Sequence, residues 1–177
     1  MNPLSCCFAG PNPKNLPYDS DENHPDCRRL KMVLVYEIER LVQSGVTTFL
    51  TGMTPGPVTW CSEFALEMKK KNSDVLLIAY LPYEEQSIHW RNEDAERYFD
   101  ILAQVDDVIT LQTRYTSDCM SKHRQRLVDA SSLVLAVHDG GRDGTKYMLD
   151  YAGNKGLGIV TVHPVTMERK YFPGTNK

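Results

Sequence analysis

Short runs of aliphatic and β-branched residues alternate along the chain with longer stretches in which apolar residues recur every three or four positions. The short runs are typical of buried strands, and the longer stretches are typical of amphipathic helices. This pattern predicts strands at residues 4–9, 47–51, 75–81, 107–111, 133–138 and 159–163, and helices at 28–43, 57–71, 92–104, 117–130 and 144–154. Since a helix separates each pair of successive strands, we expect a three-layer α/β fold with a mainly parallel sheet of about six strands.

The length of 177 residues fits one domain, which we expect over residues 1–177. No internal repeat, low-complexity tract or interior linker divides the sequence. Residues 12–26 are rich in proline, asparagine and aspartate and are expected to form an irregular loop. The residues after Pro164 are expected to form a short tail.

Charge and composition narrow the expected partners. The net charge of -3 argues against the broad basic face that duplex nucleic acid needs, so no nucleic-acid partner is expected. The sequence contains no long apolar run and no signal-peptide pattern, so we expect a cytoplasmic protein without a membrane partner. The five cysteines show neither a CxxC pair nor zinc spacing, which indicates reduced thiols, and no metal or cofactor is expected.

Glycine-containing turns follow three expected strands, at the edge where an open parallel sheet binds its ligands. Their sequences are "AGPNPKNLP", "TGMTPGP" and "HDGGRDGTK". Without a Cβ, glycine lets backbone N–H groups approach an anion at the positive end of the following helix. In the third turn, a phosphate can be held by the N–H groups of Gly144, Thr145 and Lys146, the Thr145 hydroxyl, and the charge of Arg142 or Lys146. Tight turning alone is the alternative reading of these glycines, and neither a Walker A loop nor a GxGxxG fingerprint is present.

Side chains near these turns can supply the rest of a nucleotide site. Glu63 can point at a ribose hydroxyl, or it can be an ordinary solvated glutamate on a helix face. Tyr83, Gln86 and Trp90 follow the third strand and Tyr115 follows the fourth, where an aromatic ring can stack on a planar base. Trp90 can equally serve as the hydrophobic staple of the next helix.

The chain contains, in order, the segments "CCFAGPNPKNLP", "FLTGMTPGPVTWCSEFALEMKK", "LLIAYLPYEEQSIHW", "RYFDILAQVDDVI" and "VLAVHDGGRDGTKYMLDYA". Together these five segments resemble the YpsA-like branch of the SLOG superfamily, and the likeness covers about residues 6–156. The resemblance implies a single Rossmann-like domain with a ligand pocket at the carboxyl ends of the strands, and a homodimer or higher homo-oligomer. The first loop departs from the branch, because Gly10, Pro11, Asn12 and Pro13 stand where relatives have Gly-His-Arg-Pro. A basic pair that can hold phosphate is therefore absent.

The related LOG phosphoribohydrolases carry the loop "PGGxGTxxE", whose glutamate serves catalysis on nucleoside monophosphates. Met148 stands at that position in this chain. Because cleavage of a ribosyl bond needs a carboxylate within reach of the sugar, Glu63 and Asp139 are candidate catalytic residues, and Asp143 can also substitute. No residue at a spacing typical of a catalytic or metal site accompanies His123. It is therefore interpreted as a surface histidine or as one whose hydrogen bonds are satisfied within the fold.

The leading hypothesis is a binding protein that senses or sequesters a nucleotide-derived small molecule. The first alternative is a nucleotide glycosidic-bond hydrolase or transferase, and the second is a regulatory protein that binds a partner through its outer helices. The expected ligand-binding residues are Ala9, Gly10, Asn12, Gly52, Met53, Thr54, Gly56, Glu63, Pro82, Tyr83, Gln86, Trp90, Tyr115, Asp139, Gly140, Gly141, Arg142, Gly144, Thr145 and Lys146.

Overall fold

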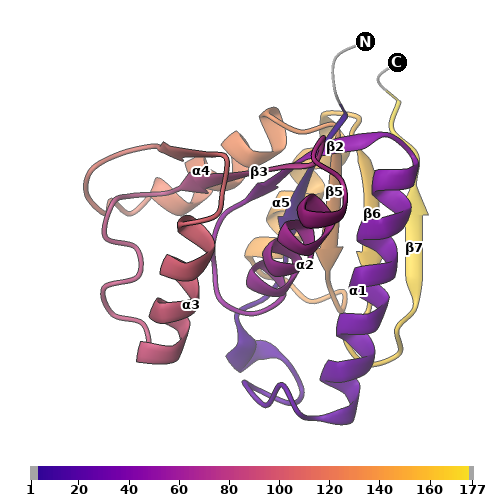
Figure 1. Cartoon of the computed structure of the whole chain (residues 1–177), viewed down its shortest axis with the longest axis horizontal. Coiled ribbons are helices and arrows are strands. Elements are labelled where there is room, and N and C mark those ends of the chain that lie inside the picture. Colours follow the sequence, from indigo (N-terminus) through magenta and orange to yellow (C-terminus); the bar gives the residue numbers. More distant parts are fainter. Residues whose placement is uncertain (1–3, 176–177) are drawn as a thin grey trace.

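The structure, a computed structural model that describes residues 4–175, is a seven-stranded sheet with helices on both faces (Figure 1). The strands are β1 (Leu4–Ala9), β2 (Val46–Thr51), β3 (Leu76–Leu81), β4 (Asp107–Thr110), β5 (Leu133–Val137), β6 (Gly158–Val162) and β7 (Arg169–Phe172). The helices are α1 (Pro25–Gln43), α2 (Pro57–Lys71), α3 (Asn92–Leu102), α4 (Cys119–Asp129), α5 (Gly144–Asn154) and the short 3-10 helix η1 (Pro13–Asn15). Residues 1–3 and 176–177 lie outside the described residues, and a single domain over 1–177 stays a prediction.

The strand order is β4-β3-β2-β1-β5-β6-β7, with β1 to β6 parallel and β7 antiparallel to β6. This confirms the predicted α/β fold with a mainly parallel sheet. β1 lies between β2 and β5, so the chain builds one side of the sheet outward from β1 and then returns to build the other side. At such a reversal a crevice forms outside the carboxyl ends of the strands. The topology therefore places a candidate site beside the ends of β1 and β5.

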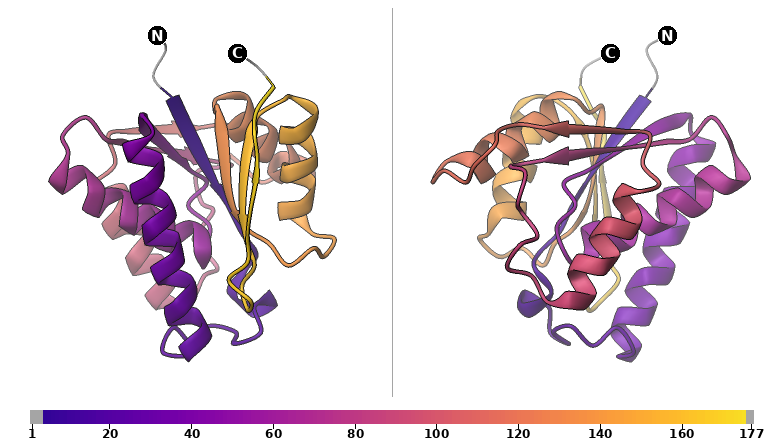
Figure 2. Two further views of the ribbon diagram at one scale, coloured as in Figure 1. Left: turned by 90° about the vertical axis from the view of Figure 1, so that its right-hand side faces the viewer. Right: turned by 60° about the vertical axis from the view of Figure 1, so that its left-hand side comes forward.

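Helices α1, α2 and α3 lie on one face of the sheet, and α4 and α5 lie on the other (Figure 2). β1 is buried between the two layers, because Cys6 and Phe8 belong to one core cluster while Cys7 and Ala9 belong to the other. A strand that is covered on both faces needs apolar residues at successive positions rather than at alternate ones. This explains the continuous apolar run of the first strand.

The seventh strand was not expected from the sequence. β7 (Arg169–Phe172) lies in the segment after Pro164 that was expected to be a tail, and all four of its residues are exposed. An edge strand of charged and aromatic residues lacks the aliphatic run by which the inner strands were recognised. A contact between residues far apart in the sequence helps to position this strand, since the Tyr171 hydroxyl donates to Glu37 of α1 over 2.6 Å.

The segment expected as an irregular loop at 12–26 contains short helical elements and local hydrogen bonds. It contains η1 and ends in the first turn of α1, which begins at Pro25 rather than at residue 28. His24 caps α1, because its Nδ1 accepts the N–H of Asp26 over 3.2 Å. In Figure 1 this segment lies at the bottom of the view, below the carboxyl end of β1.

Candidate functional site

A cavity of about 350 Å³, here called the strand-end pocket, lies outside the carboxyl ends of the central strands. Its wall comes from the loops after β1, β2 and β3, from one face of α4 and from the first turn of α5. The lining residues are Phe8, Ala9, Gly10, Pro11, Asn12, Asn15, Gly52, Thr54, Pro55, Val58, Pro82, Tyr83, Gln86, Trp90, Met120, His123, Arg124, Leu127, Asp143, Gly144, Thr145 and Met148. Eleven of the expected binding residues are in this set: Ala9, Gly10, Asn12, Gly52, Thr54, Pro82, Tyr83, Gln86, Trp90, Gly144 and Thr145.

The loop after β1 is held against the start of α2 by close backbone packing. A Cβ atom at Gly10 would lie 2.8 Å from the Cβ of Pro57, so only glycine fits at that contact. The side chain of Asn12 is already engaged, because its Oδ1 accepts the N–H of Lys14 over 3.1 Å. The part of this loop that can face a ligand is therefore the backbone around Gly10 more than the Asn12 amide.

The loop after β2 is shaped by an unusual backbone at Met53, whose φ of 60° lies in the left-handed region. The Met53 N–H donates to Thr51 Oγ1 over 3.1 Å, and Ser62 donates to the same oxygen over 2.7 Å, so the turn is fixed from inside. Met53 itself is buried in the core beneath α1, α2 and α3. Gly56, with a φ of 89°, precedes α2 and does not line the pocket.

Gln86 joins the loop after β3 to the loop after β2. Its Nε2 donates to the carbonyl oxygens of Gly52 and Met53 over 3.3 and 3.2 Å. Its Oε1 is buried and has no hydrogen-bond partner among the described residues. Because buried polar atoms in proteins are nearly always paired, this oxygen indicates a position where a ligand or water donates a hydrogen bond.

The aromatic residues expected at the site lie in two pairs. Tyr83 lines the pocket and meets the ring of Tyr115 edge-on, with centroids 5.6 Å apart, whereas Tyr115 is outside the lining. Trp90 lines the pocket and packs edge-on against Tyr98 of α3, with centroids 5.3 Å apart. Trp90 therefore lines the pocket and also packs against the next helix, while stacking of its ring on a base stays a prediction.

The first turn of α5 faces the pocket with Gly144 and Thr145. Asp143 is the N-cap, and its Oδ1 accepts the N–H of Lys146 over 2.8 Å. That N–H is therefore not free for a phosphate, in contrast to the expected cradle. The Lys146 side chain pairs with Asp150 and lines a second cavity of about 370 Å³ on the other side of the turn.

Helix α4 contributes four lining residues that the sequence reasoning missed: Met120, His123, Arg124 and Leu127. The guanidinium of Arg124 lies against Gly144, where a Cβ atom would come within 2.6 Å of its Cζ. Among residues 4–175, no hydrogen bond or ion pair joins the Arg124 guanidinium to another side chain. A cation thus lies unpaired beside the positive end of α5, which is a favourable place for an anion.

His123 is buried against the loop after β2, with 2% of its surface exposed. Burial lowers its pKa to about 4, so the imidazole is neutral at physiological pH. A Cβ atom at Gly52 would lie 2.7 Å from its Cε1, which explains the glycine at that position. The interpretation of His123 as a satisfied histidine agrees with its burial, although the residue also lines the pocket.

The two candidate catalytic residues lie outside the strand-end pocket. Glu63 binds the guanidinium of Arg97, with Oε2 accepting from Nη2 over 2.7 Å. Asp139 lines the second cavity together with Gly140, and its Oδ1 accepts the N–H of Gly141 over 2.8 Å. Arg142 is exposed and lines neither cavity.

Two general properties follow from the described part of the chain. Within residues 4–175, no group of three or more His, Cys, Asp or Glu side chains is arranged to hold a metal ion. Over the same residues, no helix combines the length and the apolar character needed to cross a bilayer.

The geometry can be compared with known proteins. The YpsA profile, that of the YspA SLOG family, matches residues 6–163. The chain belongs to the YpsA SLOG family. This family member is 28% identical over 137 residues to a UPF0398 protein of Bacillus cereus strain B4264, with 76% of this chain and 74% of that protein covered. It is 27% identical over 137 residues to a UPF0398 protein of Bacillus thuringiensis strain Al Hakam, with the same coverage.

Two solved structures share the fold of this YpsA SLOG protein. DNA processing protein A from Helicobacter pylori matches with a TM-score of 0.64 and 13% identity, covering 90% of this chain and 65% of that chain. DNA processing protein A from Streptococcus pneumoniae matches with a TM-score of 0.59 and 10% identity, covering 90% of this chain and 50% of that chain. At these identities the likeness shows the fold, and this chain spans only part of either protein.

The expectation that this YpsA SLOG protein has no nucleic-acid partner is wrong. The Helicobacter pylori protein with the same fold has a single-stranded DNA binding mode. The expectation rested on the net charge of -3, which averages over the whole surface and does not report local cations such as Arg124. Nucleic acid therefore belongs among the ligands to be tested.

Proposed function

We propose that this protein binds a nucleotide-derived small molecule in the strand-end pocket, with a phosphate group at the first turn of α5. The observation that carries the proposal is the position of the Arg124 guanidinium against Gly144. The helix N-terminus offers backbone N–H groups and a positive dipole, and the guanidinium adds a full charge with a forked set of donors. Arg124 thereby takes the place of the basic pair that is absent from the first loop.

The wall after β3 supports a base or sugar at the other end of the ligand. Gln86 is 6% exposed and is fixed through its Nε2, so its unpaired Oε1 has a defined position. An exocyclic amine or a ribose hydroxyl is the type of group that pairs with such an acceptor. The rings of Tyr83 and Trp90 line the same wall and supply flat apolar surface.

The chemistry of the lining favours binding over catalysis. Asp143 is the one carboxylate among the described residues that line the pocket, and it is engaged as the N-cap of α5. Glu63 and Asp139, proposed from the sequence as catalytic residues, lie elsewhere. A sensor or a sequestering protein is therefore the better-supported form of the function. The five cysteines are all free and buried, which supports a reducing cytoplasmic location.

The test is a retention experiment with a mixed panel of nucleosides, nucleotides, NAD, ADP-ribose, cyclic dinucleotides and a short single-stranded DNA. Bound and free compounds are separated by ultrafiltration and identified by mass spectrometry, and each retained compound is then titrated by calorimetry. We expect a phosphorylated compound to be retained intact and its parent nucleoside to be lost.

Two variants make the test specific to the pocket. Arg124→Gln is expected to weaken binding about tenfold or more, because a charge-assisted contact is lost. Arg126→Gln removes the same charge from an exposed position on the same helix and is expected to bind like the parent protein. Retention of no panel compound, or equal binding by Arg124→Gln and the parent, would overturn the proposal.

A further inference from the structure

The strand-end pocket has two walls that are not part of the sheet. The first is the segment 10–24 between β1 and α1, which supplies Pro11, Asn12 and Asn15 to the lining. The second is the segment 82–91 between β3 and α3, which supplies Gln86 and Trp90. Both segments are largely irregular, so contacts outside the pocket must set their positions.

Glu22, near the end of the first wall, makes such contacts with three helices. Its Oε1 accepts the indole N–H of Trp60 on α2 over 3.0 Å, and its carboxylate also pairs with Lys31 on α1 and with Arg97 on α3. Although burial opposes ionisation, the hydrogen bonds from Arg97 and Lys31 lower the pKa of Glu22 to about 2. The carboxylate is therefore charged throughout the physiological range.

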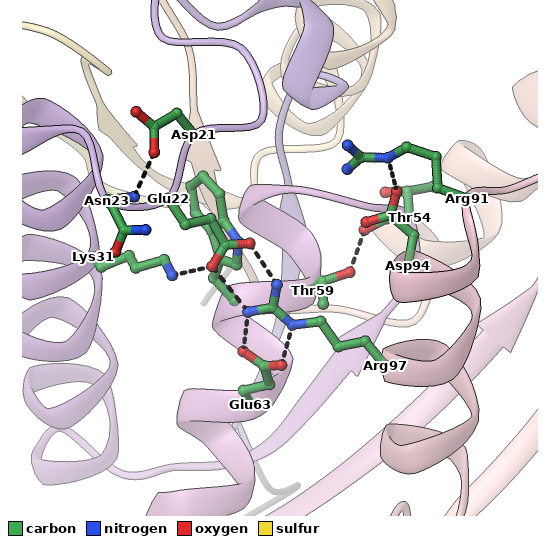
Figure 3. Close-up of polar contacts among 11 residues, drawn as sticks. Asp21, Glu22, Asn23, Lys31, Thr54, Thr59, Glu63, Arg91, Asp94 and Arg97 are labelled. Atoms are coloured by element: carbon green, nitrogen blue, oxygen red, sulfur yellow. Dashed lines mark hydrogen bonds and ion pairs between the residues drawn. The ribbon is translucent and has the colours of Figure 1, made fainter.

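Arg97 is the centre of this cluster, as Figure 3 shows. Its guanidinium extends from α3 between two carboxylates, with Glu22 on one side and Glu63 of α2 on the other. The side chain of Arg97 is 28% exposed, and those of Glu22 and Glu63 are 34% and 33% exposed. Because the three groups are partly buried, their interactions are less screened than those of ordinary surface ion pairs.

The second wall is attached to the same helix. Trp90, at the end of segment 82–91, packs edge-on against Tyr98, the neighbour of Arg97 in α3. Gln86 of the same segment is bonded to the loop after β2, which leads directly into α2. A shift of α3 away from α2 would therefore move Trp90 and strain the Gln86 contacts.

We propose that Arg97 is a positioning residue for the strand-end pocket, holding both irregular walls against α2 by binding Glu22 and Glu63 together. This inference rests on the proposed function for its effect on ligand affinity, whereas its structural part stands independently. Without the guanidinium, two carboxylates brought close by a shared partner repel each other, and both lose charge-assisted hydrogen bonds. The wall 10–24 and helix α3 then separate from α2, and the lining residues that both walls supply to the pocket are displaced.

The structural part is tested by hydrogen–deuterium exchange on the full chain, with Arg97→Gln as the variant. We expect amides in both walls, 10–24 and 82–91, to exchange about tenfold faster or more, while β5 and α5 keep the exchange of the parent. Arg91→Gln is the matched control, because Arg91 also carries a charge at the start of α3, and within residues 4–175 its one ion pair is with Asp94, over 3.0 Å. This control is expected to leave segment 10–24 unchanged.

The outcomes separate this inference from the proposed function. Faster exchange in both walls supports it even if no panel compound binds, and for a compound that does bind, Arg97→Gln is expected to lose affinity about tenfold. Unchanged exchange, or faster exchange in segment 10–24 alone, would overturn it. If Arg97→Gln fails to fold, Glu63→Gln is the second variant, because it keeps the Arg97–Glu22 pair. It is expected to speed exchange in segment 82–91 more than in segment 10–24. Exchange as slow as in the parent protein in both segments would overturn the inference as well.

Discussion

His123 of α4 donates its Nε2 hydrogen to the carbonyl oxygen of Tyr80 at the end of β3, over 2.7 Å. A carbonyl can only accept, so this contact fixes the tautomer with the proton on Nε2. Burial lowers the pKa of His123 to about 4, compared with 6.5 for a free side chain. The protonated ring also carries this N–H, so burial rather than the Tyr80 contact keeps the ring neutral in the folded protein.

The burial of His123 predicts that stability falls as the pH decreases from 6.5 towards about 4. In that window the unfolded chain binds a proton at His123 and the folded chain does not, so the free energy of unfolding decreases with decreasing pH. His123→Gln keeps a donor for the Tyr80 carbonyl but cannot titrate. Urea unfolding at about pH 7.5 and about pH 5.5 is expected to show a smaller loss of stability at the lower pH for the variant than for the parent. An equal loss in both proteins would contradict this account.

Most of the fold could be predicted because the burial of the inner strands is visible in their sequences as runs of apolar residues. Cys6 to Ala9 form a continuous apolar run since the strand is covered on both faces, and the helices show one apolar side. β7 could not be predicted in this way. Its residues are exposed, and it is positioned by pairing with β6 and by the contact between Tyr171 and Glu37, which are 134 positions apart.

The site could be predicted where it is made of loops and not where it is made of a helix. The glycine turns pointed to Gly10, Gly52 and Gly144, which all line the pocket. The contribution of α4 was missed, although its spacing carries a signal. Lining residues 120, 123, 124 and 127 fall on one helical face, and that face contains a histidine and an arginine where a purely structural face would be apolar.

Gly144→Ala is predicted to weaken phosphate binding without unfolding the protein. The new Cβ would come within 2.6 Å of the Arg124 Cζ, and the end of this flexible side chain can move away at little cost. We expect affinity for a retained phosphorylated compound to drop about fivefold to tenfold in calorimetry, with the free energy of unfolding changed by less than about 1 kcal/mol.

Gly153→Ala is the control for that substitution. It lies on the same helix, and a Cβ there meets no atom within 4 Å. It is expected to leave affinity unchanged and to stabilise the helix by about 0.5–1 kcal/mol. If the two substitutions changed affinity equally, Arg124 would not be the anion-binding group.

Asp143→Asn separates a binding protein from a hydrolase. Asparagine is as good an N-cap as aspartate, so the Lys146 N–H contact and the fold are expected to survive. Removing a negative charge beside the anion site is expected to keep or increase affinity for a phosphorylated compound. Mass spectrometry over time is expected to show no free base from either protein. Base release by the parent that is lost in Asp143→Asn would instead establish an enzyme with Asp143 as its acid or base.

Tyr171→Phe is predicted to destabilise the protein by loosening β7 from α1. Glu37 is fully buried and accepts from the Tyr171 hydroxyl over 2.6 Å, from Arg40 over 2.9 Å and from Arg169 over 3.2 Å. Loss of one donor to a buried carboxylate costs about 1–3 kcal/mol, because water cannot reach the oxygen to replace the lost hydrogen bond. Urea unfolding is expected to show this decrease, and exchange is expected to speed up at β7 first.

Tyr147→Phe provides the comparison for this loss, since it removes a hydroxyl that accepts from Gln125 over 2.6 Å at an exposed position. Both partners of that bond can be solvated, so the expected cost is below about 0.5 kcal/mol. The difference between the two variants measures the burial of Glu37 rather than the loss of a tyrosine hydroxyl. Equal costs would mean that the Tyr171 hydroxyl stabilises the protein no more than an exposed hydroxyl does, and that Arg40 and Arg169 suffice as donors to Glu37.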